Sequence, residues 1–252
     1  MVETLAALVE GASAQQDWDS TKMGRRNAHS GEADRLEAEI VSRISSLSST
    51  DTKSVRALRR HFSRQLAKAA PEIVIKLAVK LVDRSQILFR FVGYELVLHH
   101  KQALKSLDAR KLERLGKGID SWGAVDTFAC YLAGPAWREH QVADKVIHGW
   151  ARSQDRWWRR AALVSTVPLN SKARGGSGDA PRTLKVCKML LGDRDDMVVK
   201  AMSWALRELA KREPSVVRDF LRDHQKALAP RVIREVDNKL RKGLKNPRSK
   251  VA

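Results

Sequence analysis

The sequence predicts an all-α protein built as a curved superhelical array of antiparallel helix pairs, an α-solenoid. Apolar residues recur at steps of three and four through most of the chain, as in helices that bury one face. No stretch shows the sustained apolar–polar alternation and turn pairs that are typical of strands. Two segments also resemble each other at an offset of 40 residues, with Asp155 falling on Asp195. That spacing suits a repeated two-helix unit.

The periodic segments define the expected helices in order. The first runs from Leu36 to Leu47, and the Ser-Ser-Thr-Asp-Thr stretch at 48–52 supplies an N-cap for the second. Further helices are expected at about 53–69, 71–82, 84–100, 108–118, 121–133, 139–150, 154–167, 181–191, 195–211, 214–222 and 229–243. Neighbouring helices pair into HEAT-like units, and a stack of such units curves, with its concave face as the usual binding surface.

The chain divides into three regions. Residues 1–31 hold a short apolar opening and a polar run, so we expect a flexible or loosely docked segment. Residues 32–243 form the solenoid, and 244–252 form a basic mobile tail. The one long interruption, from Pro168 to Pro181 with a Gly-Gly-Ser-Gly run inside it, predicts a flexible surface loop.

Charge indicates the partner. The 252 residues are 43% hydrophobic, which excludes disorder over most of the chain. Lys and Arg number 48 against 29 Asp and Glu, a formal charge of +19 that points to a polyanion, with nucleic acid as the first candidate. No apolar run approaches the roughly 20 residues that span a bilayer, and no signal-peptide pattern occurs. We therefore expect a soluble cytoplasmic protein without a membrane partner, associated with the nucleoid if it is bacterial.

Several kinds of catalytic site have no counterpart in the sequence. Cys130 and Cys187 lie among apolar helical residues without metal-ligand spacing, so both are interpreted as reduced packing residues. There is no His-x-x-x-His or clustered Cys/His set, no Gly-rich phosphate loop before a helix, and no Ser/His/Asp arrangement. We expect neither a metal nor a cofactor.

The first of three candidate sites pairs an indole with a carboxylate. Trp122 and Asp126 are four residues apart on a helix whose buried stripe contains Val125 and Phe128, so the two are surface neighbours. Asp126 has no cation beside it on its own helix, and we expect an isolated negative charge there. The alternative interpretation is a solvated or capping aspartate.

The second site contains two adjacent arginines. Arg160 projects on the same side as Trp157, whereas Arg159 points elsewhere. An arginine held against apolar neighbours suits bidentate contact with a phosphate or carboxylate. An arginine that snorkels from a helix end is the alternative.

The third site is Trp204, which lies opposite the apolar stripe of its helix. The cations that share its side are Lys200, Arg207 and Lys211. An aromatic among cations suggests a face that meets something flat, anionic or both. Packing of Trp204 on a neighbouring helix is the alternative, because a helix in an array can be covered on two sides.

These blocks are familiar in combination. Trp122-x-x-x-Asp126, Trp157-x-x-Arg160-Ala-Ala and Lys200-Ala-x-x-Trp204-x-Leu-Arg-Glu-x-x-Lys211 closely resemble the AlkD family of HEAT-repeat DNA alkylation repair glycosylases, over about residues 53–243. The resemblance implies excision of N3- and N7-alkylated purines from duplex DNA by cleavage of the N-glycosidic bond, the first step of base excision repair. We expect a monomeric enzyme without a metal.

The resemblance also implies roles for single residues. The catalytic positions would be Asp126, Trp122, Trp204 and Arg160. Asp126 would stabilise the oxocarbenium-like sugar and orient water, the indoles would face the sugar and the cationic base, and Arg160 would hold a flanking phosphate. The residues expected to contact DNA are Arg160, Trp157, Arg159, Lys200, Arg207 and Lys211.

The sequence departs from the family pattern in three places. Residues 1–50 lack the aromatic-rich opening, Gly123 stands where a polar residue is expected, and the Gly-Ser-Gly loop at 175–178 resembles an insertion. Two other functions therefore stay open. One is a catalytically weak relative that binds or bends DNA, and the other is a HEAT-type scaffold for an acidic protein partner.

Overall fold

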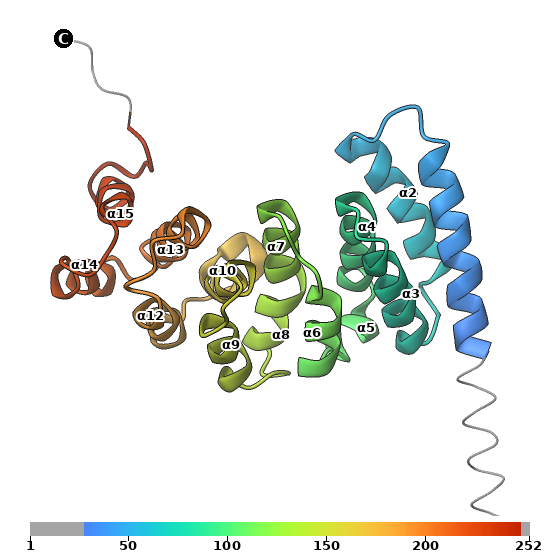
Figure 1. Cartoon of the computed structure of the whole chain (residues 1–252), viewed down its shortest axis with the longest axis horizontal. Coiled ribbons are helices and arrows are strands. Elements are labelled where there is room, and N and C mark those ends of the chain that lie inside the picture. The colour runs from blue at the N-terminus through green and yellow to red at the C-terminus, as the bar shows by residue number, and fades with distance from the viewer. Residues whose placement is uncertain (1–27, 248–252) are drawn as a thin grey trace, which may run out of the picture.

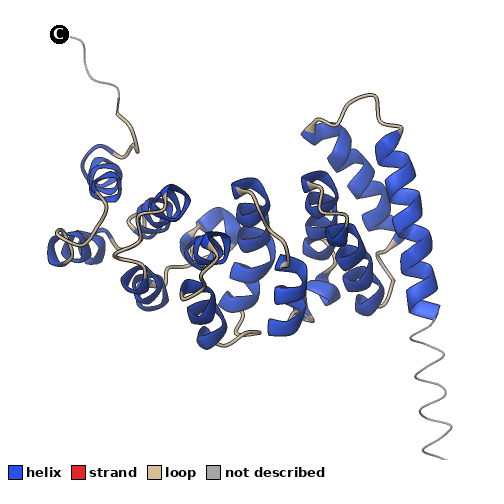
Figure 2. Ribbon diagram, viewed as in Figure 1, coloured by secondary structure: helices blue, strands red, loops and turns tan. Residues whose placement is uncertain are grey.

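The computed structural model describes residues 28–247, and its helices follow one another along a single array (Figure 1). Every regular element in this range is helical, with loops between (Figure 2). The predicted all-α solenoid is confirmed. Most of the predicted flexible segment, residues 1–27, lies outside the described range. Residues 28–31 belong to a helix at 28–45, which begins earlier than the expected Leu36.

The N-terminal half of the array follows the helix at 28–45. Its elements are α2 (Thr52–Gln65), α3 (Pro71–Asp83), α4 (Ile87–Leu98), the short α5 (Lys101–Lys105), α6 (Ala109–Gly116), α7 (Trp122–Phe128), a π-helical turn (Ala129–Ala133) and α8 (Gly134–Arg138).

The C-terminal half continues the pairing. Its elements are α9 (Asp144–Ala151), α10 (Arg156–Val164), α11 (Val167–Asn170), a 3₁₀ turn (Lys172–Arg174), α12 (Ala180–Met189), α13 (Asp196–Leu209), α14 (Pro214–Asp223) and α15 (Pro230–Lys242).

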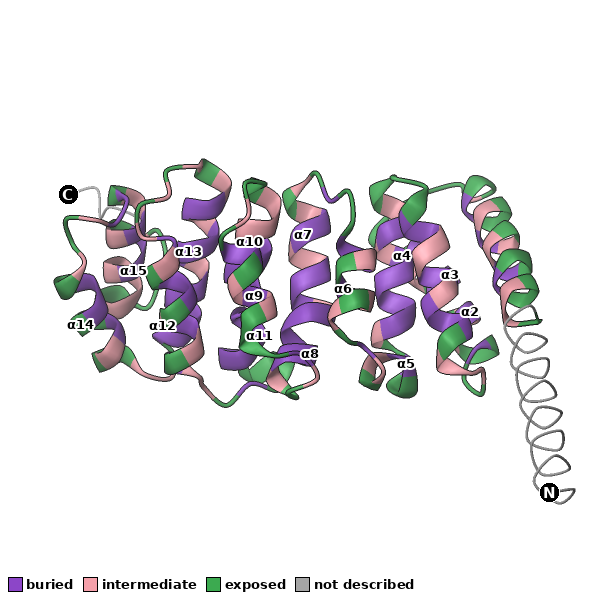
Figure 3. Cartoon of the chain, turned by 60° about the horizontal axis from the view of Figure 1, so that its bottom comes forward, coloured by how far each residue is buried: buried purple, intermediate pink, exposed green. Residues whose placement is uncertain are grey.

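The helices form two layers along a bowed array. An inner layer of α4, α7, α10, α13 and α15 lies on the concave side, and α6, α9, α12 and α14 lie on the outer side (Figure 1). Consecutive inner helices pack against each other. Buried residues run through the helices and exposed residues gather at their ends and outer edges (Figure 3). Side chains from α7, α10 and α13 therefore face the same concavity.

Aspartate side chains cap the N-termini of α2, α10 and α13. Asp51 accepts a hydrogen bond from the Ser54 N–H at 2.9 Å, which starts α2. Asp155 and Asp195, related by the 40-residue offset, accept from the residues two positions on, at 2.8 and 2.9 Å. The two caps begin α10 and α13 in the same way, so the repeat seen in the sequence corresponds to equivalent positions in the structure.

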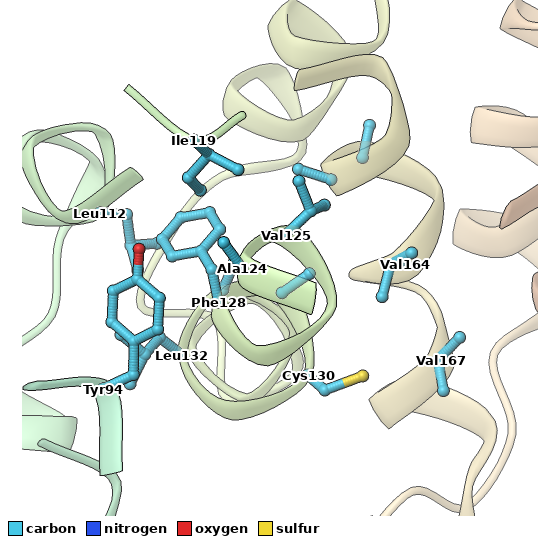
Figure 4. Packing of buried hydrophobic residues seen from close by; sticks show 14 of the residues in the cluster. Tyr94, Leu112, Ile119, Ala124, Val125, Phe128, Cys130, Leu132, Val164 and Val167 are labelled. Carbon is cyan, nitrogen blue, oxygen red and sulfur yellow. The ribbon is translucent and has the colours of Figure 1, made fainter. Parts of the chain in front are cut away.

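The core beside the site is centred on Phe128, at the end of α7 (Figure 4). Its fully buried ring lies 5.8 Å from the ring of Tyr94, whose hydroxyl donates to the Leu115 carbonyl at 2.9 Å. Burial raises the pKa of Tyr94 to about 12. Cys130 and Cys187 are buried and unpaired, as predicted, and burial raises the pKa of each thiol to about 12.

The helix that begins at Trp122 continues to Arg138 through the π-helical turn. The wide turn accommodates Pro135, whose ring would clash with the Tyr131 carbonyl in a regular α-helix. The predicted helix at 139–150 is wrong at its start. The preceding helix ends at Arg138, and α9 begins only at Asp144. The buried Trp137 extends the preceding helix, and its indole N–H donates to Asp144 at 2.8 Å.

The segment from Pro168 to Pro181 was expected to be a flexible surface loop, and the structure agrees only in part, because residues 172–175 and 177 are exposed whereas the two ends of the segment are packed. Asn170 is buried, and its side chain donates to the Thr183 hydroxyl at 2.9 Å. The Arg212 guanidinium donates to the carbonyls of Asn170 and Gly176, at 3.0 and 2.7 Å. The glycine-rich segment is held against the array by hydrogen bonds. The Asn170 side chain accepts from the Asp179 N–H, and Arg212 donates to the Gly176 carbonyl.

Replacement of Gly176 by alanine tests this packing. A Cβ there would lie 2.3 Å from the Pro168 carbonyl oxygen, a backbone atom that cannot rotate away. We expect the free energy of unfolding to fall by roughly 1–3 kcal/mol, as measured by urea denaturation. Gly149→Ala is the control, since nothing lies within 4 Å of a Cβ there and alanine favours α9. Equal stability of the two variants would contradict the packed segment.

Candidate functional site

A cavity of about 310 Å³ opens among the inner helices. Its walls come from α7, α10, α13 and the segment after α15, and the residues that line it are Trp122, Arg160, Met197, Lys200, Trp204, Arg207 and Lys245. Residues from all three candidate sites therefore line one cavity on the inner layer. Trp122 and Trp204, the most distant of them, are 82 positions apart in the sequence.

The two indoles differ in exposure. Trp122 is the first residue of α7, and 63% of it is exposed although it is a large apolar side chain. Trp204 is partly buried and packs against the core while it lines the cavity. The alternative interpretation, packing of Trp204 within the array, is therefore confirmed in part, and contact of its open face with a ligand stays a prediction. An exposed indole opposite a fixed one provides two flat apolar surfaces for a planar ligand.

Asp126 and Arg160 form a two-pronged ion pair between α7 and α10. The Arg160 Nε and Nη2 donate to the two carboxylate oxygens at 2.9 and 2.8 Å. The side chains are 19% and 7% exposed, respectively. The expectation of an isolated negative charge at Asp126 is therefore wrong, because the counterion comes from a neighbouring helix 34 residues away in sequence.

The third corner of the guanidinium is also occupied. Arg160 Nη1 donates to the Met197 carbonyl at 2.6 Å, at the start of α13. Each of the three guanidinium nitrogens thus donates one hydrogen bond within the protein, while Arg160 still lines the cavity, and its contact with a phosphate stays a prediction. The sequence had left two bidentate partners open for Arg160, a phosphate and a carboxylate, and in the structure the partner is a carboxylate.

Burial determines the acidity of Asp126. Burial raises the pKa of this carboxyl above its ordinary value, and the hydrogen bonds and charge of Arg160 offset part of that rise. Asp126 does not itself line the cavity and adjoins it through Arg160. A carboxylate with a raised pKa and a partly open face is one that can exchange a proton or meet a developing positive charge.

Besides Arg160, two of the predicted DNA-contacting cations line the cavity. Lys200 pairs with Asp196 at 2.6 Å, and Arg207 donates through Nε to the Ser203 hydroxyl at 3.2 Å. Burial lowers the pKa of the Arg207 guanidinium, with nearby carboxylates opposing the shift, yet an arginine remains charged at neutral pH. The cavity thus presents positive charge beside its indoles.

The other predicted contacts lie elsewhere. Lys211 does not line the cavity and pairs with Glu208 at 2.8 Å. Arg159 pairs with Asp193 at 2.7 Å and lines a separate cavity, so the adjacent arginines do point to different neighbours as predicted. Trp157 is partly buried, with the Arg156 guanidinium 4.8 Å from the centre of one of its rings. Contact of these three residues with DNA stays a prediction.

Sequence reasoning missed two residues of the cavity. Met197 contributes a wall and the carbonyl that binds Arg160. Lys245 reaches the cavity from the segment after α15 and lies 3.5 Å from Glu235. That segment was expected to be mobile. In its described part, 244–247, the Lys245 carbonyl accepts a hydrogen bond from the Asn238 side chain of α15, and the mobility of the tail stays a prediction. Its charge was visible in the sequence, but no periodicity indicated its position.

A second, apolar cavity of about 340 Å³ adjoins the first turn of α7. Gly123 and Ala124 line it together with residues of α2 and α4, including Phe91. A Cβ on Gly123 would lie 3.2 Å from the end of the exposed Ile87 side chain. The glycine at this departure from the family pattern therefore leaves room beside Trp122 that a larger residue would reduce.

Within residues 28–247 no three His, Cys, Asp or Glu side chains are grouped so that they could hold a metal ion. Among the described helices, none combines the length and apolar character needed to cross a membrane.

Comparison with known proteins gives one match. A family model described as DNA alkylation repair enzyme matches residues 46–240, which spans most of the chain and all of the cavity-lining residues except Lys245. No curated protein matches the chain.

Replacement of Arg160 by methionine tests the ion pair. Without its counterion the buried carboxyl of Asp126 should have a still higher pKa in the folded state, because the lowering contribution is lost. The loss of unfolding free energy caused by the unpaired carboxylate is then greatest above that pKa, and it becomes smaller as pH falls and Asp126 becomes neutral. We expect a loss of about 3 kcal/mol in unfolding free energy at pH 7 and less at pH 4.5, measured by urea denaturation.

The double variant Asp126→Asn/Arg160→Met provides the control. It lacks the buried charge, so we expect it to be more stable than Arg160→Met alone at pH 7. A loss that is the same at both pH values and in both variants would mean that Arg160 acts only through packing.

Proposed function

The chain belongs to the family of DNA alkylation repair enzymes, and from this premise we propose that it is a DNA glycosylase that excises N3- and N7-alkylated purines from duplex DNA. Family membership gives a role in alkylation repair. The reaction and the substrate are our proposal. The observation that carries them is the meeting of Trp122, Trp204 and the Asp126–Arg160 pair at one positively charged cavity.

The substrate itself supplies much of the reactivity. A purine alkylated at N3 or N7 is cationic, so it leaves as a neutral base when the bond between C1′ and nitrogen breaks and both electrons go to the base. Water then adds to C1′ and loses a proton. Because the leaving group is already positively charged, the proposed reaction uses neither a metal nor a cofactor, and a monomer suffices.

Asp126 is the proposed catalytic carboxylate. Its negative charge would stabilise the sugar as positive charge develops on C1′ and the ring oxygen, and it would orient the water and accept its proton. Arg160 uses one donor for each carboxylate oxygen, so each oxygen keeps a further lone pair. We assign Arg160 to the orientation of Asp126, in place of the phosphate contact expected from the sequence.

The indoles would recognise the positive charge of the lesion. A cation over the face of a tryptophan gains about 0.5–2 kcal/mol, which favours an alkylated purine over a neutral base. The exposed Trp122 is free to meet the sugar or base, and the packed Trp204 forms the fixed wall. Lys200 and Arg207 would bind phosphates of the strand that enters the cavity.

The ion pair also favours a second candidate, a catalytically weak relative that binds DNA. A carboxylate paired with an arginine has little net charge to offer a developing cation. The cations of the cavity would serve binding equally well in that case. The two candidates differ in whether the damaged base is released, which the following experiment measures.

Asp126→Asn should abolish excision and spare binding. Asparagine removes the charge while keeping nearly the same size, so release of 7-methylguanine from methylated duplex DNA should fall roughly 100-fold or more. Affinity for the duplex should be unchanged or higher, because DNA no longer meets a negative charge. Base release without divalent metal and fluorescence anisotropy measure the two quantities.

Asp193→Asn is the matched control. Asp193 is likewise a poorly exposed carboxylate paired with an arginine of α10, but it lies away from the indoles. We expect it to retain excision. If wild type releases no base, the DNA-binding candidate is favoured; if Asp126→Asn releases base as fast as wild type, the role of Asp126 is wrong.

Salt dependence separates both candidates from a scaffold for an acidic protein. Each phosphate contact contributes a slope of about −0.9 in the plot of log affinity against log salt. With the two contacts of Lys200 and Arg207, affinity for duplex DNA should fall roughly 12-fold between 50 and 200 mM salt. Anisotropy titrations measure it. A change below about twofold would argue against a DNA-binding cavity.

A further inference from the structure

The chain reverses direction after α15. Gly243 has φ 69°, in the left-handed region, and its N–H donates to the Lys239 carbonyl at 3.0 Å to end the helix. The Asn238 side chain then donates to the Lys245 carbonyl at 3.2 Å. Because of this turn, Lys245 lies back over α15 instead of continuing away from it, and its side chain lines the cavity with Trp122 and Trp204.

The Lys245 ammonium has one carboxylate neighbour and is partly exposed. It lies 3.5 Å from one oxygen of Glu235, and its side chain is 42% exposed. The same oxygen accepts a closer hydrogen bond, 2.6 Å, from the Ser203 hydroxyl. Glu235 therefore has a partner without Lys245, and the ammonium keeps donors for a ligand in the cavity.

Arg207 adds a second cation beside this lysine. It is linked to the same group, because its Nε donates to the Ser203 hydroxyl that binds Glu235. No ion pair within 4.0 Å joins Arg207 to a carboxylate in the described part of the chain, although its side chain is partly buried. Desolvation of a cation that no carboxylate contacts directly is unfavourable, and a phosphate would relieve it.

We propose that Lys245 and Arg207 form a phosphodiester site at the edge of the cavity, and that the Gly243 turn is the device that places Lys245 there. This site rests on the proposed function, since it would hold the DNA backbone beside the alkylated nucleotide. It would take over the phosphate contact expected of Arg160, which is engaged with Asp126 and Met197.

Lys245→Gln tests the phosphate contact. The ligand is a duplex with one tetrahydrofuran abasic-site analogue, which cannot be cleaved, so binding is measured whether or not the protein excises bases. We expect a roughly three- to tenfold loss of affinity near 100 mM salt and a salt slope smaller by about 0.9. Lys242→Gln, an exposed lysine that does not line the cavity, should leave the slope unchanged.

A second pair of variants tests the turn with Lys245 intact. Nothing lies within 4 Å of a Cβ at Gly243, so its substitution changes the backbone and not the packing. Gly243→Val should weaken binding as Lys245→Gln does, because a β-branched residue disfavours positive φ. Gly243→Asn should bind like wild type, because asparagine tolerates this conformation.

The readouts separate the phosphate site from the proposed reaction. On DNA with 7-methylguanine, Lys242→Gln should release base as wild type does, whereas Lys245→Gln should need a higher protein concentration to reach half of its maximal rate, because the lysine acts on binding. Identical slopes for Lys245→Gln and Lys242→Gln would overturn the phosphate site even if wild type excises bases. Wild-type affinity in Gly243→Val would overturn the role of the turn. Absence of base release in wild type would overturn only the glycosylase.

Discussion

The ion pair between Asp126 and Arg160 is the interaction on which the site depends. Arg160 binds the carboxylate of α7 with two nitrogens and the first turn of α13 with the third, so one buried guanidinium joins three consecutive inner helices. Two of these helices carry Trp122 and Trp204. A buried ion pair contributes little net stability compared with apolar packing, but it is costly to break, which makes it suited to fixing one arrangement. The separation of the two indoles is thus set by the same contact that orients the carboxylate.

The pair also sets the electrostatics of the cavity. Because Asp126 and Arg160 neutralise each other, the field is dominated by Lys200, Arg207 and Lys245. Such a field attracts phosphates and disfavours a cationic base that arrives alone. In the proposed reaction, a phosphate bound to these cations would remove that repulsion, so the DNA backbone would bind before the indoles and the carboxylate act on the positive lesion. Binding of the strand and recognition of the lesion would then be coupled through charge.

Local rules predicted much of this molecule and long-range contacts account for the rest. Helical period and N-cap residues located most helices, and the shared face of Lys200, Trp204 and Arg207 is present in the structure. The partner of Asp126 was not predictable, because it depends on how α7 crosses α10. The glycine-rich segment after Pro168 was expected to be flexible because its composition is that of a loop, whereas Arg212, in the turn between α13 and α14, donates to two of its carbonyls. Lys245 follows a turn whose direction no periodicity reveals.

The two arginines in the middle of α10 link the position of the carboxylate at the site to the packing of the helices around it. A rotation of about 100° per residue sends Arg160 toward Asp126 and the cavity, and Arg159 toward Asp193 and the loops beside α9 and α13. Both pairs are short and poorly exposed, so any rotation of α10 about its axis would break both at once. The packing of the array therefore holds the carboxylate in place. A change in the curvature of the solenoid around DNA would have to move α7, α10 and α13 together, as one body.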